Sequence, residues 1–101
     1  MNKPAVLGTS QAIAKIRDIL REGTLVVSDH CKRVRMRERD VTYADIASCL
    51  RNGTINRAAE WDEQYCNWKY RVEGFDKDGE DLTSITIIIE ANMEIFVITI
   101  F

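Results

Sequence analysis

The sequence predicts an α+β domain in which N-terminal helices pack on one face of a C-terminal antiparallel sheet of about four strands. In the first half of the chain, apolar residues recur at spacings of three and four, which indicates helices. After Gly53 the pattern changes to apolar runs and alternation bounded by turn residues, which indicates strands. Because no helical pattern separates the later strands, we expect them to pair antiparallel.

Length and composition fit a single domain over residues 1–101. The chain is 46% hydrophobic and 30% charged, with a formal net charge of −2, and is long enough for one core but not for two. No apolar run approaches the roughly 20 residues that cross a membrane. Residues 1–8 lack the apolar segment of a signal peptide. Three cysteines without a C-x-x-C pair are typical of reduced thiols, so we expect a cytoplasmic protein without membrane contact, metal or cofactor.

The N-terminal third is predicted to be an arm followed by a helix. Residues 1–8 show no periodicity and are expected to form a loose arm. Residues 9–23 carry an apolar stripe at helical spacing, with Thr9 or Ser10 as the cap. Gly23 is the glycine expected just beyond a helix end.

The next segment is predicted to be a short strand followed by two helices. Thr24–Val27 is a β-branched run of strand length. Residues 28–53 then hold a basic helix over about 29–39 and a further helix that begins at a Thr42 capping box. Ser28 or Asp29 is the expected cap of the basic helix, and Gly53 ends the second. The side chains expected to face the core from the basic helix are Cys31, Val34 and Val41.

Residues 54–101 are predicted to form the sheet. A loop is expected over 60–66 and a hairpin turn at DKDG, residues 76–79, where glycine supplies positive φ. The strands are predicted at 54–59, 67–75, 82–90 and 94–101. The side chains predicted to be largely buried are Trp68, Tyr70, Ile85, Ile87, Phe96 and Ile98.

The last two strands are apolar on both faces, which places them in the centre of the sheet. Simple alternation puts Ile100 on the face of Phe96 and Ile98, and Phe101 on the face of Ile95 and Val97. In so short a chain, helices can cover only one sheet face. We therefore expect the other face, or the edge of the last strand, to be covered by a second copy in a homodimer or by another protein.

The most informative stretch is the basic segment over residues 28–39. It holds five basic and two acidic side chains, a local net charge of +3 in an acidic protein, and the only histidine, His30. Such a segment favours an anionic ligand. Arg35 and Arg39 lie four residues apart on one helix stripe and can converge on a single phosphate. The other candidate phosphate or RNA contacts are Ser28, Lys32, Arg33, Arg37, Lys69 and Arg71.

A set of short motifs resembles a known family. The chain reads S-x-H at residues 28–30, RMRERDVT at 35–42 and DI at 45–46, and then has a tyrosine-containing strand, the DKDG turn and an ITI ending. Over residues 26–101 this pattern resembles the family called domain of unknown function 4258. The family histidine precedes the last arginine of R-M-x-E-R by eight residues, whereas His30 precedes Arg39 by nine. One additional residue would rotate His30 about 100° around an ideal helix.

The resemblance implies a small prokaryotic toxin of a toxin–antitoxin pair, with a fold grouped with the RelE, MqsR and barnase-like ribonucleases. The implied partners are RNA and an antitoxin protein. Metal-free RNA cleavage needs a proton acceptor, a proton donor and cations around the phosphorane. His30 can serve in proton transfer, since histidine changes charge near neutral pH. Arg35 and Arg39 can clamp the phosphate, and Tyr70 can donate a proton or stack on a base.

Each candidate also has a structural interpretation. His30 can cap the basic helix together with Ser28, the two arginines can form surface ion pairs, and Tyr70 can belong to the core with Trp68. The acidic sequence pI of about 5.4 argues against a general nucleic-acid binder. The alternative functions are therefore a non-catalytic module that holds an acidic protein partner, or a structural domain on the same fold.

Overall fold

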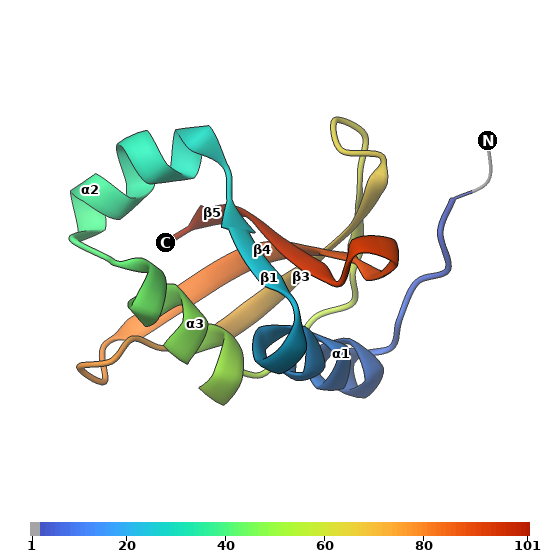
Figure 1. Ribbon diagram of the computed structural model, residues 1–101, viewed down its shortest axis with the longest axis horizontal. Helices are drawn as coiled ribbons and strands as arrows, with labels where there is room; N and C mark the ends of the chain where they lie inside the picture. Colours follow the sequence, from blue (N-terminus) through green and yellow to red (C-terminus); the bar gives the residue numbers. More distant parts are fainter. Residues whose placement is uncertain (1–2) are drawn as a thin grey trace.

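The computed structural model describes residues 3–101 and confirms an α+β architecture: a five-stranded sheet with two helices packed on one face (Figure 1). The strand order is β1-β5-β4-β3-β2, which confirms the central positions expected for the last two strands. The elements are α1 (Thr9–Glu22), β1 (Thr24–Val27), a π-helical turn η1 (Cys31–Arg35), α2 (Met36–Arg39), α3 (Tyr43–Asn52), β2 (Glu60–Asp62), β3 (Asn67–Phe75), β4 (Asp81–Ile89), a 3-10 turn η2 (Glu90–Asn92) and β5 (Glu94–Ile100).

The sheet is mixed rather than antiparallel, which corrects the prediction. β3, β4 and β5 pair antiparallel, as does the short β2 with β3, but β1 runs parallel to β5 with Thr24 opposite Glu94 and Val27 opposite Val97. The expectation of antiparallel pairing applies only to strands that a short turn connects. β1 is separated from β5 by most of the chain, so its direction is set by the helices that precede and follow it.

The prediction was also wrong about the first strand after α3. No strand forms at 54–59: Thr54 exchanges two backbone hydrogen bonds with Glu73, and the chain then leaves the sheet. The strand lies within the predicted loop instead, where β2 pairs with β3 and places Trp61 opposite Trp68. Only Ile55 is buried in the short apolar run after Gly53, which is too little to hold a strand against the core.

The helix ends largely follow the sequence. Gly8, rather than Thr9 or Ser10, precedes the first turn of α1, and the Gln11 side chain accepts the Gly8 N–H. Gly23 ends α1 as predicted. α3 begins at the predicted capping box, in which Thr42 and Asp45 each accept the other's backbone N–H.

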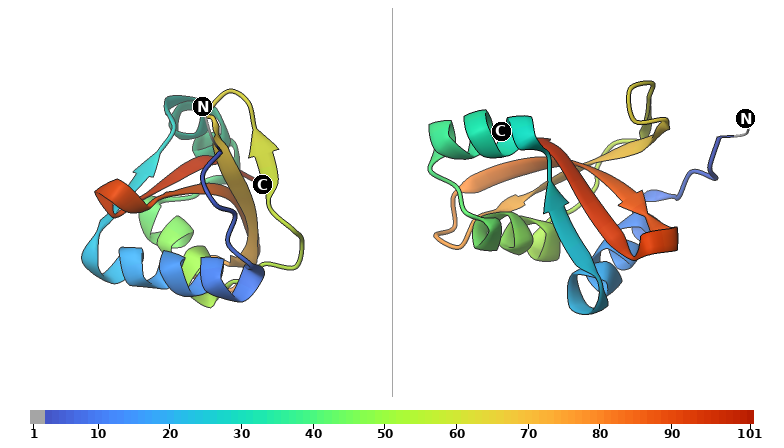
Figure 2. Two further views of the ribbon diagram at one scale, coloured as in Figure 1. Left: turned by 90° about the vertical axis from the view of Figure 1, so that its right-hand side faces the viewer. Right: turned by 45° about the horizontal axis from the view of Figure 1, so that its top comes forward.

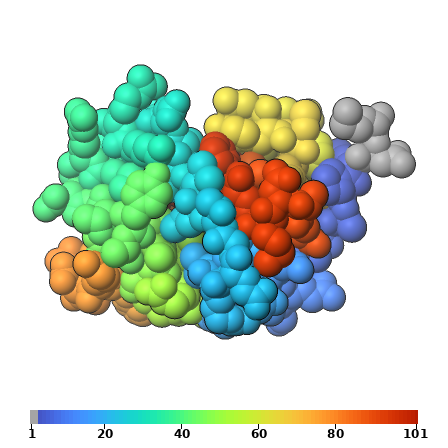
Figure 3. Space-filling view, in the orientation of Figure 1, coloured from blue at the N-terminus to red at the C-terminus, as the bar shows by residue number. Residues whose placement is uncertain are grey.

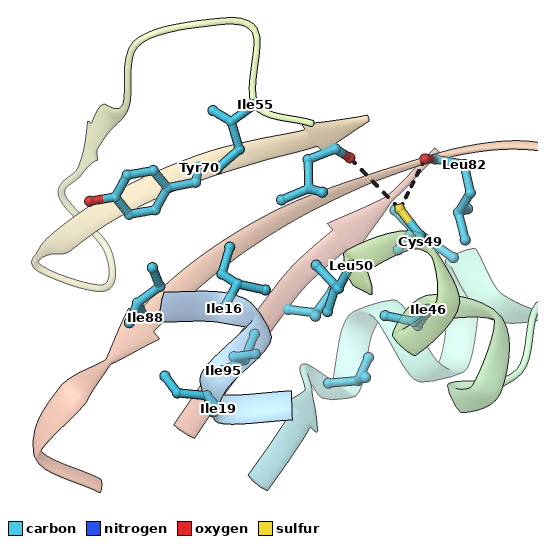
Figure 4. Close-up of a cluster of buried hydrophobic side chains, with 14 of the residues drawn as sticks. Ile16, Ile19, Ile46, Cys49, Leu50, Ile55, Tyr70, Leu82, Ile88 and Ile95 are labelled. Carbon is cyan, nitrogen blue, oxygen red and sulfur yellow. Dashed lines mark hydrogen bonds between the residues drawn. The ribbon is translucent and has the colours of Figure 1, made fainter. Parts of the chain in front are cut away.

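The core lies between the sheet and the helices α1 and α3 (Figures 2 and 4). α1 contributes fully buried Ile16 and Ile19, and α3 contributes Ile46 and Leu50. The Cys49 thiol is enclosed in this layer and donates toward the carbonyl oxygen of Leu82 at 3.1 Å. Burial raises its pKa to about 11, so the thiol is protonated and behaves as a small apolar side chain.

A bulge in β5 overturns the simple alternation predicted for the last strand. Ile85 lies opposite Thr99 and the next residue of β4 lies opposite Val97, so Ile98 has no partner. The shift moves Ile100 into the core beside Val97 and leaves Phe101 45% exposed.

The burial predictions are confirmed for two of the six side chains. Tyr70 is buried on the helix-covered face, and on the opposite face Ile87 is buried as well. The remaining side chains predicted to be buried are only partly so: Trp68, Ile85, Phe96 and Ile98. No described helix packs over the opposite face, hereafter the open face, which explains the exposure of Ile85, Phe96 and Ile98. Trp68 is on the helix-covered face, at the margin of the core. On the open face Tyr65 packs on Phe96, with ring centroids 5.2 Å apart.

Between residues 3 and 101, no helix is both long and apolar enough to span a membrane.

Candidate functional site

The basic helix comprises residues 29–39 and starts where β1 ends. Ser28 joins the two elements: its N–H donates to the Val97 carbonyl, and its hydroxyl donates to the Ile98 carbonyl at 2.7 Å. The same hydroxyl accepts the Cys31 N–H at 3.1 Å and so caps the helix, as predicted. Ser28 is buried, so its role here is to fix the helix against the end of β5.

A π-helical turn lies within the basic helix. It spans Cys31–Arg35, and the Met36 N–H donates to the Cys31 carbonyl, five residues back. A turn closed in this way holds one more residue than an α turn. The π turn therefore changes the rotation of His30 relative to Arg39 from that expected for an ideal helix. His30 lies immediately before this turn and is exposed.

The C-terminal end of the basic helix is also tightly anchored. Asp40 adopts a left-handed conformation, with φ 53° and ψ 48°. The Val41 N–H donates to the Met36 carbonyl and the Asp40 N–H to the Arg37 carbonyl, which is the Schellman pattern. Val41 is buried beyond it. Both ends of the helix are thus held by the core while its cations face solvent.

His30 and all five predicted basic side chains of the helix are exposed: Lys32, Arg33, Arg35, Arg37 and Arg39. Arg35 approaches Glu38 at 3.5 Å, with both side chains about half-exposed, an ion pair that contributes little to stability. Arg39 donates one guanidinium N–H to the Asp81 carbonyl at 3.0 Å, which ties the helix to the start of β4. Neither arginine pairs with Asp45, whose carboxylate is engaged elsewhere. Arg35 and Arg39 keep the four-residue spacing needed to meet one phosphate.

Tyr70 lies away from these cations. Its ring is 3% exposed and belongs to the core, and its hydroxyl accepts the Leu7 N–H from the N-terminal arm at 3.0 Å. Because side chains alternate along β3, Lys69 and Arg71 project from the open face, opposite Tyr70. The structure therefore gives Tyr70 a structural contact and turns its ring to the face of β3 opposite the side chains of Lys69 and Arg71.

The two β3 cations each have a carboxylate neighbour. Lys69 Nζ lies 3.4 Å from Asp62, and Arg71 Nε lies 3.4 Å from Glu73. The Tyr65 N–H, with Lys69 adding to it, lowers the pKa of Asp62, and the Asn56 amide, with Arg71 adding to it, lowers the pKa of Glu73. Both carboxylates are therefore anionic at neutral pH.

A pocket of about 230 Å³ opens beside these two cations, and sequence reasoning missed it. Its walls come from β2, β3, β4, β5 and the chain before β2. The lining residues are Arg57, Ala58, Glu60, Lys69, Tyr70, Arg71, Ile85, Ile98 and Thr99. Lys69 and Arg71 were predicted as anion contacts, but nothing in the sequence pattern indicated that Arg57 and Thr99 would join them.

The basic helix and the hairpin between β2 and β3 rise on the same side of the sheet, away from α1 and α3 (Figures 1 and 2). In the space-filling view they stand as separate ridges with atoms of β5 between them (Figure 3). The basic helix and this hairpin thus lie beside the side of the sheet that α1 and α3 leave uncovered.

Among residues 3–101, no group of three or more His, Cys, Asp and Glu side chains is arranged to hold a metal ion. Cys31 and Cys49 are buried free thiols and Cys66 is exposed.

Comparison with known proteins assigns the chain to a family. No curated protein and no solved structure matches it. A family model described as Domain of unknown function (DUF4258) matches residues 27–101, from the end of β1 through the basic helix, α3 and the rest of the sheet. The match covers the Ser28–Asp45 motifs and all of the sheet except the first three residues of β1, and leaves out α1. The chain therefore belongs to the DUF4258 family.

Proposed function

We propose that this protein is the toxin component of a toxin–antitoxin-like pair and that it cleaves RNA without a metal ion. The observation that carries the proposal is the distribution of its cations. Exposed cations of the basic helix, and the cations of β3 that line a pocket in the sheet, come from segments far apart in sequence and both lie outside the helix-covered core. An extended polyanion such as single-stranded RNA fits cations distributed in this way, because its phosphates recur along the strand.

In this proposal the basic helix supplies the chemistry. His30 transfers a proton at the 2′-hydroxyl or the leaving oxygen, which its solvent-exposed position permits. Arg35 and Arg39 bind the phosphate whose charge increases in the transition state, with guanidinium donors that remain beyond their present contacts. Lys32, Arg33 and Arg37 hold neighbouring phosphates. Anchoring at both ends keeps the helix rigid, as a catalytic surface requires.

The test is cleavage of an end-labelled single-stranded RNA in the presence of EDTA, together with growth arrest on induced expression. We expect His30→Ala and Arg35→Ala each to lower the rate by about 10²-fold. Arg39→Lys keeps the charge but loses the guanidinium fork, so it should lower the rate as well. Arg21→Ala is the matched control, because Arg21 is an exposed arginine on α1 that pairs with Asp18. Circular dichroism checks that each variant is folded.

Two outcomes would overturn the proposal. One is a wild-type protein that neither cleaves RNA nor arrests growth. The other is cleavage that folded His30→Ala and Arg35→Ala variants carry out as fast as Arg21→Ala does. Tyr70→Phe distinguishes a structural from a catalytic role for Tyr70. An unchanged rate of RNA cleavage indicates a structural residue, whereas a large loss of cleavage in a folded variant indicates a catalytic one.

A second candidate function is protein binding through the open face. Ile85, Phe96 and Ile98 are only partly buried there, and Phe101 is 45% exposed. An antitoxin or a second copy of the chain would bury this apolar surface. Sedimentation of the wild type against Phe96→Ser tests self-association. A monomer at high protein concentration, with no binding to the product of the neighbouring gene, would exclude this function.

A further inference from the structure

The pocket on the open face combines an apolar floor with cationic walls. Ile85 and Ile98, partly exposed, contribute apolar side chains from two adjacent strands. Thr99 also lines the pocket, because the β5 bulge turns two consecutive residues, Ile98 and Thr99, toward this region. A floor of this kind suits the flat face of a heterocycle, and a volume of about 230 Å³ accommodates one base with part of its sugar.

The cations of the pocket retain donors for an anion. Lys69 has three ammonium protons and uses one contact, with Asp62 at 3.4 Å. Arg71 uses Nε toward Glu73 and lays its guanidinium over the Phe101 ring at 4.8 Å. Its Nη groups and the whole Arg57 side chain make no hydrogen bond within residues 3–101. Asp62 and Glu73 lie outside the pocket lining, so these donors can be directed into it.

One carboxylate, Glu60, does line the pocket. It lies opposite Lys69 in the pairing of β2 with β3. Three cations and one carboxylate line the pocket, and Asp62 and Glu73 pair with two of these cations from outside the lining. The negative charge of Glu60 should weaken the binding of an anion there. This arrangement yields two substitutions with opposite expected effects: loss of a cation should weaken binding, and neutralisation of Glu60 should strengthen it.

We propose that this pocket is a subsite for one nucleotide of the RNA strand, with the base over Ile85 and Ile98 and the phosphate at Lys69, Arg71 and Arg57. The inference rests on the proposed function, because it assigns this subsite to the same RNA. An inorganic anion alone would leave the apolar floor uncovered, and an apolar ligand alone would leave unused the hydrogen-bond donors that Lys69, Arg71 and Arg57 keep beyond their present contacts. A nucleotide satisfies both with one molecule.

The experiment is an NMR titration of ¹⁵N-labelled protein with uridine 3′-monophosphate, with uridine and inorganic phosphate as separate arms. We expect the nucleotide to shift the amide signals of Lys69, Arg71 and Thr99, and each fragment alone to bind more weakly. Lys69→Met, which keeps the aliphatic stem, should weaken nucleotide binding about tenfold. Glu60→Gln should tighten it. Arg21→Ala is the control and should leave binding unchanged.

The result separates this inference from the proposed function. RNA cleavage with no nucleotide-induced shift in the pocket, or with shifts confined to residues 29–39, would overturn the subsite and leave the cleavage proposal intact. Nucleotide binding that responds to Lys69→Met and Glu60→Gln, in a protein that does not cleave RNA, would support the subsite and refute cleavage. Equal affinity of the wild type and both variants would refute the subsite.

Discussion

The buried carboxylate of Asp45 accepts several hydrogen bonds, so replacing Asp45 should lower the stability of the domain. The carboxylate is 6% exposed and accepts three hydrogen bonds. Two come from Thr42, through its N–H at 2.9 Å and its hydroxyl at 3.0 Å, and one comes from the Lys77 N–H at 3.1 Å. Asp45 thus joins the start of α3 to the turn between β3 and β4. The bonds from Thr42 and Lys77 lower its pKa.

The substitution Asp45→Asn keeps the size of the side chain and removes its charge and one acceptor. An amide can accept from Thr42 or from Lys77, but its NH₂ group then faces a donor on the other side. A hydrogen bond to a charged group contributes about 1.5–3 kcal/mol, so losing one and weakening the others should lower the free energy of unfolding by about 2–3 kcal/mol. In a domain of this size that corresponds to a fall in Tm of roughly 10–20 °C.

The pH dependence of the stabilisation by Asp45 follows from the direction in which folding shifts its pKa. Because folding lowers the Asp45 pKa, the stabilisation is complete above the unfolded value of about 4 and is lost as the pH falls through the folded pKa. Urea unfolding of wild type and Asp45→Asn, followed by circular dichroism, should therefore show a stability difference at pH 7 that shrinks below about pH 4. Asp18→Asn, on the solvent-facing side of α1, is the control. A difference under 0.5 kcal/mol at pH 7, or one of equal size at pH 2, would refute this explanation.

Three further predictions concern the basic helix and the arm. Asp40→Gly should raise the free energy of unfolding by about 0.5 kcal/mol, since glycine tolerates the left-handed conformation and the substitution removes a carboxylate from the negative end of the helix dipole. Asp40→Ala keeps the backbone strain and should lower the free energy of unfolding. Deleting Arg33 should convert the π turn into an α turn and lower the free energy of unfolding by about 1 kcal/mol. Deleting Ala47 from α3 should unfold the protein, and thermal melts would distinguish the two outcomes. Tyr70→Phe should cost about 1 kcal/mol in urea unfolding, because the Leu7 N–H loses its acceptor, and an unchanged midpoint would contradict that contact.

The parts of the fold that could be predicted are those encoded by neighbouring residues. The Thr42 capping box, the end of α1 at Gly23 and the turn at Gly79, whose φ is 85°, all depend on residues within a few positions. The parallel partner of β1 depends instead on contacts across about 70 residues, which periodicity does not report. The bulge at Ile98 is similar, because one unpaired residue reverses the faces of Ile100 and Phe101 without any change in the pattern of apolar residues.

In the candidate site, too, residues close together in sequence could be predicted, and residues that the fold brings together could not. The cations of the basic helix could be found because they lie close together in sequence, and their exposure follows from the narrow apolar seam of the helix. The pocket could not be found, since Arg57 lies in a segment predicted as a strand and Thr99 turns toward the pocket through a bulge. Tyr70 was selected for its chemistry, but alternation along β3 puts its ring in the core.

The two faces of the sheet have separate physical roles, and this explains where the chain departs from simple rules. On the helix-covered face, fully buried side chains such as Ile95 and Val97 supply the burial that stabilises the fold. On the open face, Ile85 and Ile98 remain partly exposed beside Lys69 and Arg71, an arrangement that gains little from folding alone. Apolar surface next to cations with donors to spare is stabilised fully only when a ligand covers both. The open face is therefore where changes in binding should separate from changes in stability.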